Sequence, residues 1–532
     1  MATTGRPGVY ISENFTPLVT NTVLSGGALP CIVAAHPRGP IQPTLIQSWN
    51  QFVQLYGNFT QAPNSILPFA VYEFFNNGGS QLFVLRLPNS DATPAALTLT
   101  DIATSPTNAL TVTSLSPGVW GEQIFISIVV KQSGYFDFNV YLGSGTNSSL
   151  VETFPSMAMD PANPRYCATM LNSPTNGSQY VNVTDLISGA GVPVGTGPFP
   201  DAYVLGSSDL APTGPLPLTG GSDGSVAPVL GTVIPQWLDT LVNQVLIVNV
   251  PGLSDVTTLN QLIAWAGLRT DKFIVIDGPA PIPAALNATG YSTVCANEYI
   301  SMVNSGSPNL TASSYAAIYA PWVLAQDPSS SVPGACRWLP PGPFMLGQYN
   351  STDVARGAFV TPAGTKNTLK LISLETQFTQ ADLDNLNNVQ VNAIKLVPGA
   401  GFCPFGGRTL SLGYPSRYIS VRRMIMQLEH DFKTLLLPLM FEPNDYLLWR
   451  QITSILTNYL TQQMQIGALG GSTPTDTFQI TCDATNNTDA MAAAGIVTTD
   501  VAVALLSPAE YININVTQFQ GSGTTTVTTT AS

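Results

Sequence analysis

The stretch PAEYININVTQF at residues 508–519 alternates polar and apolar side chains near the end of this chain of 532 residues. Alternation with a period of two is typical of a β-strand with one buried face. Only a polar tail follows it, so the strand has no later segment to pair with. We therefore expect it to pair with the edge of another sheet. The residues of this predicted C-terminal arm are Tyr511, Ile512, Ile514, Val516 and Phe519.

The opposite terminus has a similar character. RPGVYISE at residues 6–13 is a short β-prone run behind a Pro-Gly turn signal, and its apolar residues are Val9, Tyr10 and Ile11. An extended segment at each end of a folded body can pair with its own sheet or complete the sheet of a neighbouring subunit. The second arrangement makes a polymer. Pairing of both segments within their own subunit is the alternative.

Nine short phrases along the chain occur in a consistent order. They are PGVYI at 7–11, PGVWGEQI at 117–124, LTGGSDG at 218–224, YAAIYAPWV at 315–323, DVARGAFVTPAG at 353–364, GRTL at 407–410, RYISVRR at 417–423, FEPND at 441–445 and SPAEYI at 507–512. Together they resemble the contractile tail sheath proteins of bacteriophages and related injection machines. The segment of roughly 125–217 and the tail after 520 fall outside the resemblance.

This resemblance implies a structural subunit that polymerises as stacked hexameric rings around an inner tube. Contraction of the sheath would drive the tube through the envelope of a target cell. The implied partners are further copies of the chain, the inner tail tube protein, and baseplate and tail terminator proteins. The implied location is the tail of a virion, after assembly in the cytoplasm of the bacterial host. The sheath of a headless contractile injection system is the alternative.

The order of predicted elements indicates a multidomain chain of the α/β and α+β classes. Apolar strands at 29–35, 81–87, 244–250 and 272–277 are connected by helical patterns, which predicts an α/β sheet. Between them, a Thr-, Ser- and Gly-rich stretch of short alternating segments predicts an inserted β-rich domain. The expected domains are an N-terminal linker arm at 1–17, a sheath core at 18–90 and 220–400, an inserted β-rich outer domain at 91–219, a C-terminal α+β domain facing the inner tube at 401–507, and a C-terminal linker arm with a polar tail at 508–532.

Two amphipathic helices are predicted near the C-terminus. Ile425, Leu428, Phe432 and Leu435 are spaced by three and four residues, and a second helix is expected to begin with Asn444 as its N-cap. Polar residues of the matching phrases are candidates for contacts outside the subunit or for orienting a tube-facing domain. These candidates are Arg417, Arg422, Arg423 and Asn444. Structural roles inside the fold are the alternative for each of them.

The composition excludes several classes of protein. Charged residues make up only 9% of the chain and the net charge is −13, without a basic run that could track phosphates, so we expect no nucleic-acid partner. No apolar stretch approaches the ~20 residues that a membrane helix needs, so we expect no membrane insertion. The six cysteines form no CxxC pair and only two histidines are present, which predicts free thiols and no metal site.

The best catalytic motif is Gly220-Gly221-Ser222-Asp223-Gly224, which satisfies the G-x-S-x-G pattern of α/β-hydrolases. The Pro-rich segment before it cannot supply the strand that this motif requires, and the only histidine after the serine is His430. We therefore expect no enzymatic activity and no cofactor. A hydrolase-like enzyme and a surface adhesin are the more distant alternatives. The G-x-x-x-x-G-K-[ST] motif of nucleotide-binding P-loops is absent from the sequence. We therefore expect any mechanical work to come from energy stored in the assembly, and not from nucleotide hydrolysis by this chain.

Overall fold

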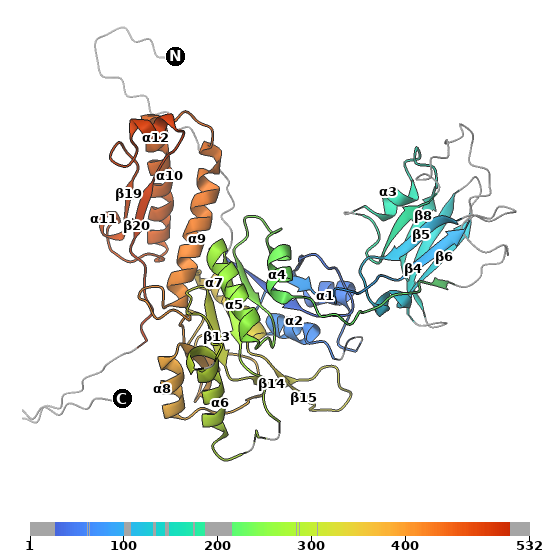
Figure 1. Cartoon of the computed structure of the whole chain (residues 1–532), viewed down its shortest axis with the longest axis horizontal. Coiled ribbons are helices and arrows are strands. Elements are labelled where there is room, and N and C mark those ends of the chain that lie inside the picture. The colour runs from blue at the N-terminus through green and yellow to red at the C-terminus, as the bar shows by residue number, and fades with distance from the viewer. Residues whose placement is uncertain are drawn as a thin grey trace, which may run out of the picture.

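The computed structural model describes residues 27–510, apart from gaps at 61, 63, 101–107, 131–134, 144–147, 174–175, 187–214, 284, 287 and 306. Three bodies are visible in Figure 1. A central body contains the largest sheet, a β body (residues 95–218) lies at one end of the long axis, and a C-terminal body (residues 419–505) lies toward the other. The predicted arms at Val9–Ile11 and Tyr511–Phe519 lie outside the described residues.

The central body is built from two stretches of chain on either side of the β body. The first contains β1 (Leu29–Ala34), β2 (Thr44–Ile46), α1 (Trp49–Tyr56), α2 (Leu67–Asn76) and β3 (Leu82–Arg86). The second contains α4 (Leu230–Leu238), β11 (Leu246–Asn249), α5 (Val256–Arg269), β12 (Lys272–Asp277), α6 (Tyr291–Ile300), η5 (Ser301–Ser305), β13 (Ala316–Ala320), β14 (Val323–Gln326), β15 (Cys336–Leu339), α7 (Gly342–Arg356), β16 (Ser373–Leu374), α8 (Gln380–Asn388), β17 (Val391–Val397) and β18 (Gly401–Pro404). The predicted mixed α/β class is confirmed.

The main sheet of the central body has eight strands in the order β18-β17-β13-β12-β11-β1-β3-β2. The six strands from β17 to β3 are parallel, whereas β2 and β18 pair antiparallel at the two edges. The chain first adds β3 on one side of β1 and later adds β11, β12 and β13 on the other. This reversal of strand order is typical of a doubly wound sheet, with helices on both faces.

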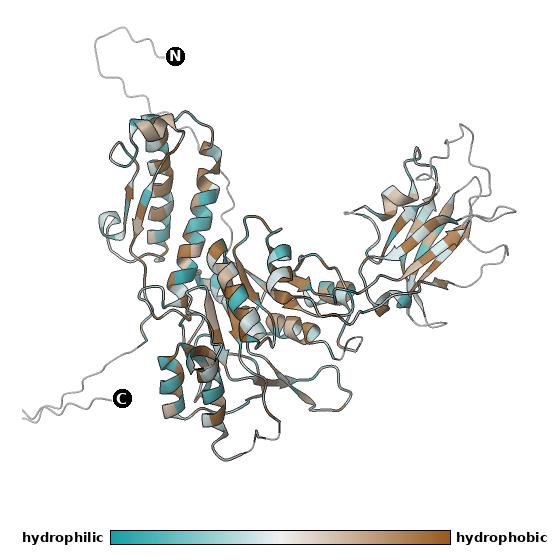
Figure 2. Ribbon diagram, in the orientation of Figure 1, coloured by the Kyte–Doolittle hydropathy of each residue, from teal (hydrophilic) through white to brown (hydrophobic). Residues whose placement is uncertain are grey.

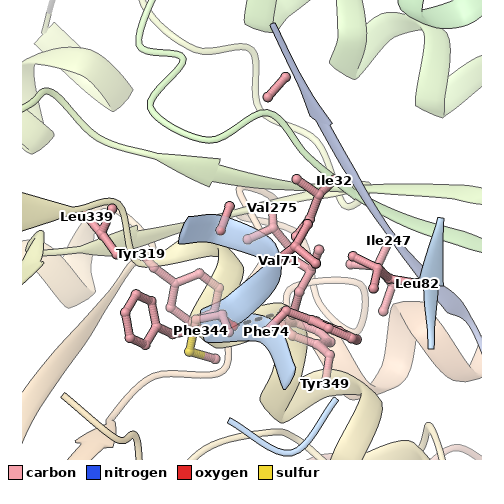
Figure 3. Close-up of a cluster of buried hydrophobic side chains, with 14 of the residues drawn as sticks. Ile32, Val71, Phe74, Leu82, Ile247, Val275, Tyr319, Leu339, Phe344 and Tyr349 are labelled. Atoms are coloured by element: carbon pink, nitrogen blue, oxygen red, sulfur yellow. Dashed lines mark hydrogen bonds between the residues drawn. The ribbon is translucent and has the colours of Figure 1, made fainter. Parts of the chain in front are cut away.

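Alternation along β1 explains the two layers of the core. Ile32 and Ala34 belong to the hydrophobic cluster under α1, α2 and α7, and Cys31 and Val33 belong to the cluster under α4, α5 and α6. Figure 3 shows the first cluster, where Phe74 and Tyr349 from two helices meet strand residues such as Val275. The strands of this sheet are the most uniformly hydrophobic part of Figure 2. A parallel sheet covered on both faces requires such apolar strands.

The β body packs two antiparallel sheets around a hydrophobic core of its own. Its elements are β4 (Ala96–Thr100), β5 (Asn108–Ser114), η1 (Val119–Gln123), β6 (Ile124–Val130), β7 (Phe136–Leu142), β8 (Ser149–Met157), α3 (Cys167–Leu171), β9 (Val181–Asp185) and β10 (Leu216–Pro217). The sheets have the orders β4-β5-β9 and β10-β6-β7-β8. Their buried faces share one cluster that includes Trp120, Phe138 and Leu218.

The C-terminal body contains two long helices and a small sheet. Its elements are α9 (Ile419–Leu436), η6 (Leu437–Leu439), α10 (Tyr446–Gln465), α11 (Pro474–Thr477), β19 (Phe478–Thr481), α12 (Asp489–Ala493) and β20 (Asp500–Val503). The predicted N-cap of the second helix is wrong by one residue. The Asp445 carboxylate accepts hydrogen bonds from the amides of Leu447 and Leu448, because an Asp side chain can satisfy two free amides of the first turn.

Candidate assembly interfaces

The carboxyl edge of the parallel strands, where doubly wound sheets bind ligands, is filled by the protein's own groups. Asp277 at the end of β12 accepts hydrogen bonds from the Asn249 side chain and from the amides of Gly252 and Gly342, the last at 2.6 Å. Burial raises the pKa of Asp277 to about 6 despite these donors. Trp322 covers the same edge and donates to the Gly278 carbonyl. The usual ligand crevice is therefore occupied by internal hydrogen bonds.

The G-x-S-x-G motif lies at the base of the β body and carries no nucleophile elbow. The backbone of Ser222 forms an antiparallel bridge with Thr93 through two hydrogen bonds of 3.0 Å. The neighbouring Asp223 carboxylate accepts from the amide of Val119 at 2.9 Å. His430 lies on α9 in the C-terminal body, so the structure does not bring it to the serine. The motif joins two stretches of chain instead of forming a catalytic dyad.

Arg86 fixes the junction between the central body and the β body. Its guanidinium donates to the carbonyls of His36, Pro37 and Gly39 in the loop after β1, and to the carbonyl of Pro117 at 2.7 Å. Arg86 is 1% exposed, and burial lowers its pKa to about 10, so it stays protonated at neutral pH. A buried cation is tolerated here because carbonyl oxygens surround it. Sequence reasoning missed this residue, although Pro117 opens one of the quoted phrases.

The small sheet of the C-terminal body contains two strands, and no other described strand pairs with its outer edges. Strands β19 and β20 pair antiparallel from Phe478 with Val503 to Thr481 with Asp500, and among the described residues they form a two-stranded sheet. One face packs on the cluster that includes Leu460 and Leu469. An isolated pair of strands is marginally stable, and unpaired edges are templates for strand addition. Its outer edges are therefore candidate acceptors for an added strand.

The four candidate residues near the C-terminus occupy different environments. Arg417 donates to the Leu412 carbonyl near the surface, and Arg422 stacks over the Tyr315 ring while bonding its hydroxyl at 3.2 Å. Arg423 is 3% exposed and pairs with Asp353, which is the structural role inside the fold. The Asn444 side chain donates to the Ala492 and Ile496 carbonyls and thereby fastens the turn between α9 and α10 to the end of α12.

An exposed apolar tip closes the far end of the C-terminal body, and sequence reasoning did not find it. Its residues are Leu437, Met440, Phe441, Tyr446 and Leu447, each more than half exposed. Phe441 is 100% exposed and adopts a left-handed backbone with φ of 71°. A bulky residue rarely adopts this conformation, and such strain gathers at functional sites. The phrase FEPND contains Phe441, which was the available signal.

Metal sites, membrane-spanning helices and reactive thiols are the remaining features to consider in the described part of the chain. Within it, no cluster of three His, Cys, Asp or Glu side chains is arranged to hold a metal ion. Among the described helices, none combines the length and apolar character that crossing a bilayer requires. The six cysteines are all free, and Cys336 is the exposed one.

Three solved structures that share this fold are sheath proteins of contractile systems. The sheath tail protein of Listeria innocua matches with a TM-score of 0.58 and 12% identity over 90% of this chain and 95% of its own. The helical sheath of the anti-feeding prophage in its contracted state matches with a TM-score of 0.55 and 18% identity over 97% and 100%. The contracted sheath complex of an extracellular contractile injection system, PVC, matches with a TM-score of 0.52 and 18% identity over 98% and 99%.

These matches confirm the predicted resemblance to contractile tail sheath proteins at the level of the fold. They run along nearly the whole chain, through the β body and the C-terminal body alike. Neither the scan of family models nor the search of curated proteins gives a match. At such low identity the comparison establishes the fold, and the function is argued from the interfaces.

Proposed function

We propose that this protein is the subunit of a contractile sheath that polymerises as stacked hexameric rings around an inner tube. The observation that carries the proposal is the two-stranded sheet of β19 and β20, whose edges have no further partner among the described residues. The chain also has a β-prone segment at each end, at residues 6–13 and 508–519. Each arm would add a strand to the sheet of a neighbouring subunit, because strand addition satisfies backbone groups at an open edge.

Strand exchange gives a lattice that can change shape without falling apart. A contact that is not self-complementary leaves unpaired arms and unfilled acceptor sheets at the ends of the polymer, so assembly continues as a helix. In this proposal the extended sheath is kinetically trapped and contraction releases the stored free energy. The similarity to structural sheath proteins, and a ligand crevice filled by Asp277 and Trp322, support a structural role without enzymatic activity.

The two outer bodies would serve different surfaces of the cylinder. We assign the β body to the outer wall and the C-terminal body to the inner tube, since the two bodies lie toward opposite ends of the molecule (Figure 1). The exposed apolar tip around Phe441 would then be covered by the tube protein, and baseplate and tail terminator proteins would contact the ends of the sheath. In this proposal the protein is part of a tail assembly that is made in the bacterial cytoplasm.

A headless contractile injection system is the second candidate, and the match to the PVC sheath complex favours it. Both candidate functions require the same kind of sheath polymer. Negative-stain electron microscopy of the purified full-length chain tests the proposal, because a sheath subunit forms long, hollow, striated cylinders. The proposal is rejected if the protein is folded, as a cooperative thermal unfolding transition would show, and yet stays monomeric at every concentration.

A further inference from the structure

Arg408, in the phrase GRTL, is held rigidly against the central sheet. Its backbone amide donates to the Asn392 side-chain oxygen at 2.8 Å, and the Asn392 amide group donates in return to the Arg408 carbonyl at 2.8 Å. Asn392 lies on β17 and also donates to the Ile318 carbonyl on β13. The backbone of Arg408 therefore has a fixed position relative to two strands of the central body.

The guanidinium of Arg408 binds the carboxylate of Glu510, the last described residue before the C-terminal segment. Nε lies 3.0 and 3.2 Å from the two carboxylate oxygens, and Nη2 lies 2.5 Å from Oε2. Nη1 donates to the Asn387 carbonyl at the end of α8. The two side chains are 9% and 19% exposed. A bidentate ion pair that is shielded from solvent to this extent is stronger and more directional than an ordinary surface ion pair.

The position of this pair decides which body holds the C-terminal segment. After β20 the chain is last tied to the C-terminal body at Leu505, which bridges to Leu469. It then runs back toward α8, as Figure 1 shows, and meets Arg408 on the central body. Residues 506–510 have mostly exposed backbone and side chains, apart from the Glu510 carboxylate. Nothing among the described contacts other than this pair fixes the start of the segment to the central body.

We propose that Arg408 and Glu510 form a clamp that makes the C-terminal arm depart from the central body instead of the C-terminal body. The inference rests on the proposed strand exchange and names the residues that position its donor. With the clamp closed, the arm couples the central body of one subunit to the small sheet of the next. With the clamp open, residues 506–510 join the tether and lengthen it by about 17 Å.

A longer tether lowers the effective concentration of the arm at its acceptor, and it no longer transmits the movement of the central body. Loss of the clamp should therefore weaken polymerisation while leaving the subunit folded. A purely structural role for the pair makes the opposite prediction, because the subunit itself would then lose stability.

The test uses full-length chains carrying Glu510→Ala, Arg408→Met, both changes together, or Glu442→Ala as a matched exposed control. We expect Glu510→Ala to raise the protein concentration needed for cylinders about 3- to 10-fold. Its melting temperature should stay near that of the wild type. Glu510→Gln retains one acceptor oxygen, so its threshold concentration for cylinders should lie between those of the wild type and Glu510→Ala. The double variant should be no worse than Arg408→Met alone, because coupled residues are not additive.

Hydrogen exchange of the unpolymerised subunit provides the second measurement. The amides of Leu506, Ser507, Ala509 and Glu510 should exchange faster in Glu510→Ala and remain unchanged in Glu442→Ala. An unchanged threshold for polymerisation, unchanged exchange, or a large fall in melting temperature in Glu510→Ala would each overturn the clamp. A chain truncated after Glu510 keeps the clamp and lacks the arm. If that chain still forms cylinders, strand exchange itself fails, and this outcome is distinct from failure of the clamp.

Discussion

Arg423 on α9 donates a hydrogen bond to the carboxylate of Asp353 on α7, and the two side chains are 2% and 1% exposed. The guanidinium also lies over the Tyr349 ring, 4.7 Å from its centroid. This pair is the most deeply buried ionic link between the C-terminal body and the central body among the described residues. Both residues come from quoted phrases, so the resemblance to sheath proteins includes the joint between two bodies.

Replacing Asp353 with Asn should destabilise the subunit by about 3–5 kcal/mol, because Arg423 would remain buried without an opposite charge. Urea unfolding of the monomer measures this change. Arg269→Met provides the matched control, since Arg269 pairs with Asp239 on the surface at 3.4 Å. The control should cost less than about 1 kcal/mol. Equal effects of the two variants would show that the buried pair has no special role.

Glu73 on α2 should make stability depend on pH. It is 3% exposed, and burial raises its pKa to about 7, although Asn76 donates to it. Because the folded state binds this proton more tightly than the unfolded state, the stabilisation is complete below about pH 4.5 and is lost as the pH rises through about 7. The expected loss is about 3 kcal/mol at most.

Glu73→Gln removes the titrating group and retains an acceptor for Asn76. Denaturant unfolding between pH 4.5 and pH 8 should therefore give a flatter profile for this variant than for the wild type. Glu429→Gln, at an exposed position of α9, should leave the profile unchanged. Parallel profiles of stability against pH for the wild type and Glu73→Gln would contradict the assignment of this pH dependence to Glu73.

The thiols should react in two groups. Cys336 is exposed and the other five cysteines are buried, and burial raises the pKa of Cys31 and Cys167 to about 12. A thiol reagent should label one cysteine quickly in the native subunit and all six after unfolding. Cys336→Ser should abolish the fast reaction. A disulfide found by non-reducing mass spectrometry would contradict assembly in a reducing cytoplasm.

The β body should be removable without loss of the central body. Ala96 and Thr219 exchange two backbone hydrogen bonds, of 2.9 and 3.0 Å, where the chain enters and leaves it. Replacing residues 97–218 with an Asn-Gly turn would close this ladder as a hairpin. Arg86 keeps three of its four carbonyl partners. We expect soluble subunits that still polymerise. Insoluble protein would show that the β body is part of the central core.

Local patterns predicted much of the central body. The strand at Lys272–Asp277 was predicted with the bounds that the structure gives, and Asp255 caps α5 by accepting from the Thr258 amide. These features depend on periodicity and on capping chemistry within a few residues. The cap of α10 shifted from Asn444 to Asp445, because both residue types are good caps and only the fold selects between them.

The contacts that organise the interfaces could not be predicted in the same way. Arg408 and Glu510 are 102 residues apart, and Arg423 and Asp353 are 70 apart. No periodicity relates such pairs, since they meet only when separate bodies pack together. The exposure of Phe441 is equally a property of the folded surface. The resemblance to sheath proteins identified the phrases that contain these residues, but only the structure shows which residues they contact.

Electron microscopy of chains without their arms tests the central claim most directly. Deletion of residues 1–16, truncation after Glu510, and replacement of Ile512, Ile514 and Val516 together by Asp each remove or spoil a strand that would complete a neighbour's sheet. The account predicts that these chains keep the circular dichroism and melting temperature of the full-length monomer and form no cylinders. Long, striated cylinders from either shortened chain, at the concentrations that the full-length protein needs, would contradict it. Unfolding of the shortened chains would contradict it as well, because the strands would then belong to their own subunit.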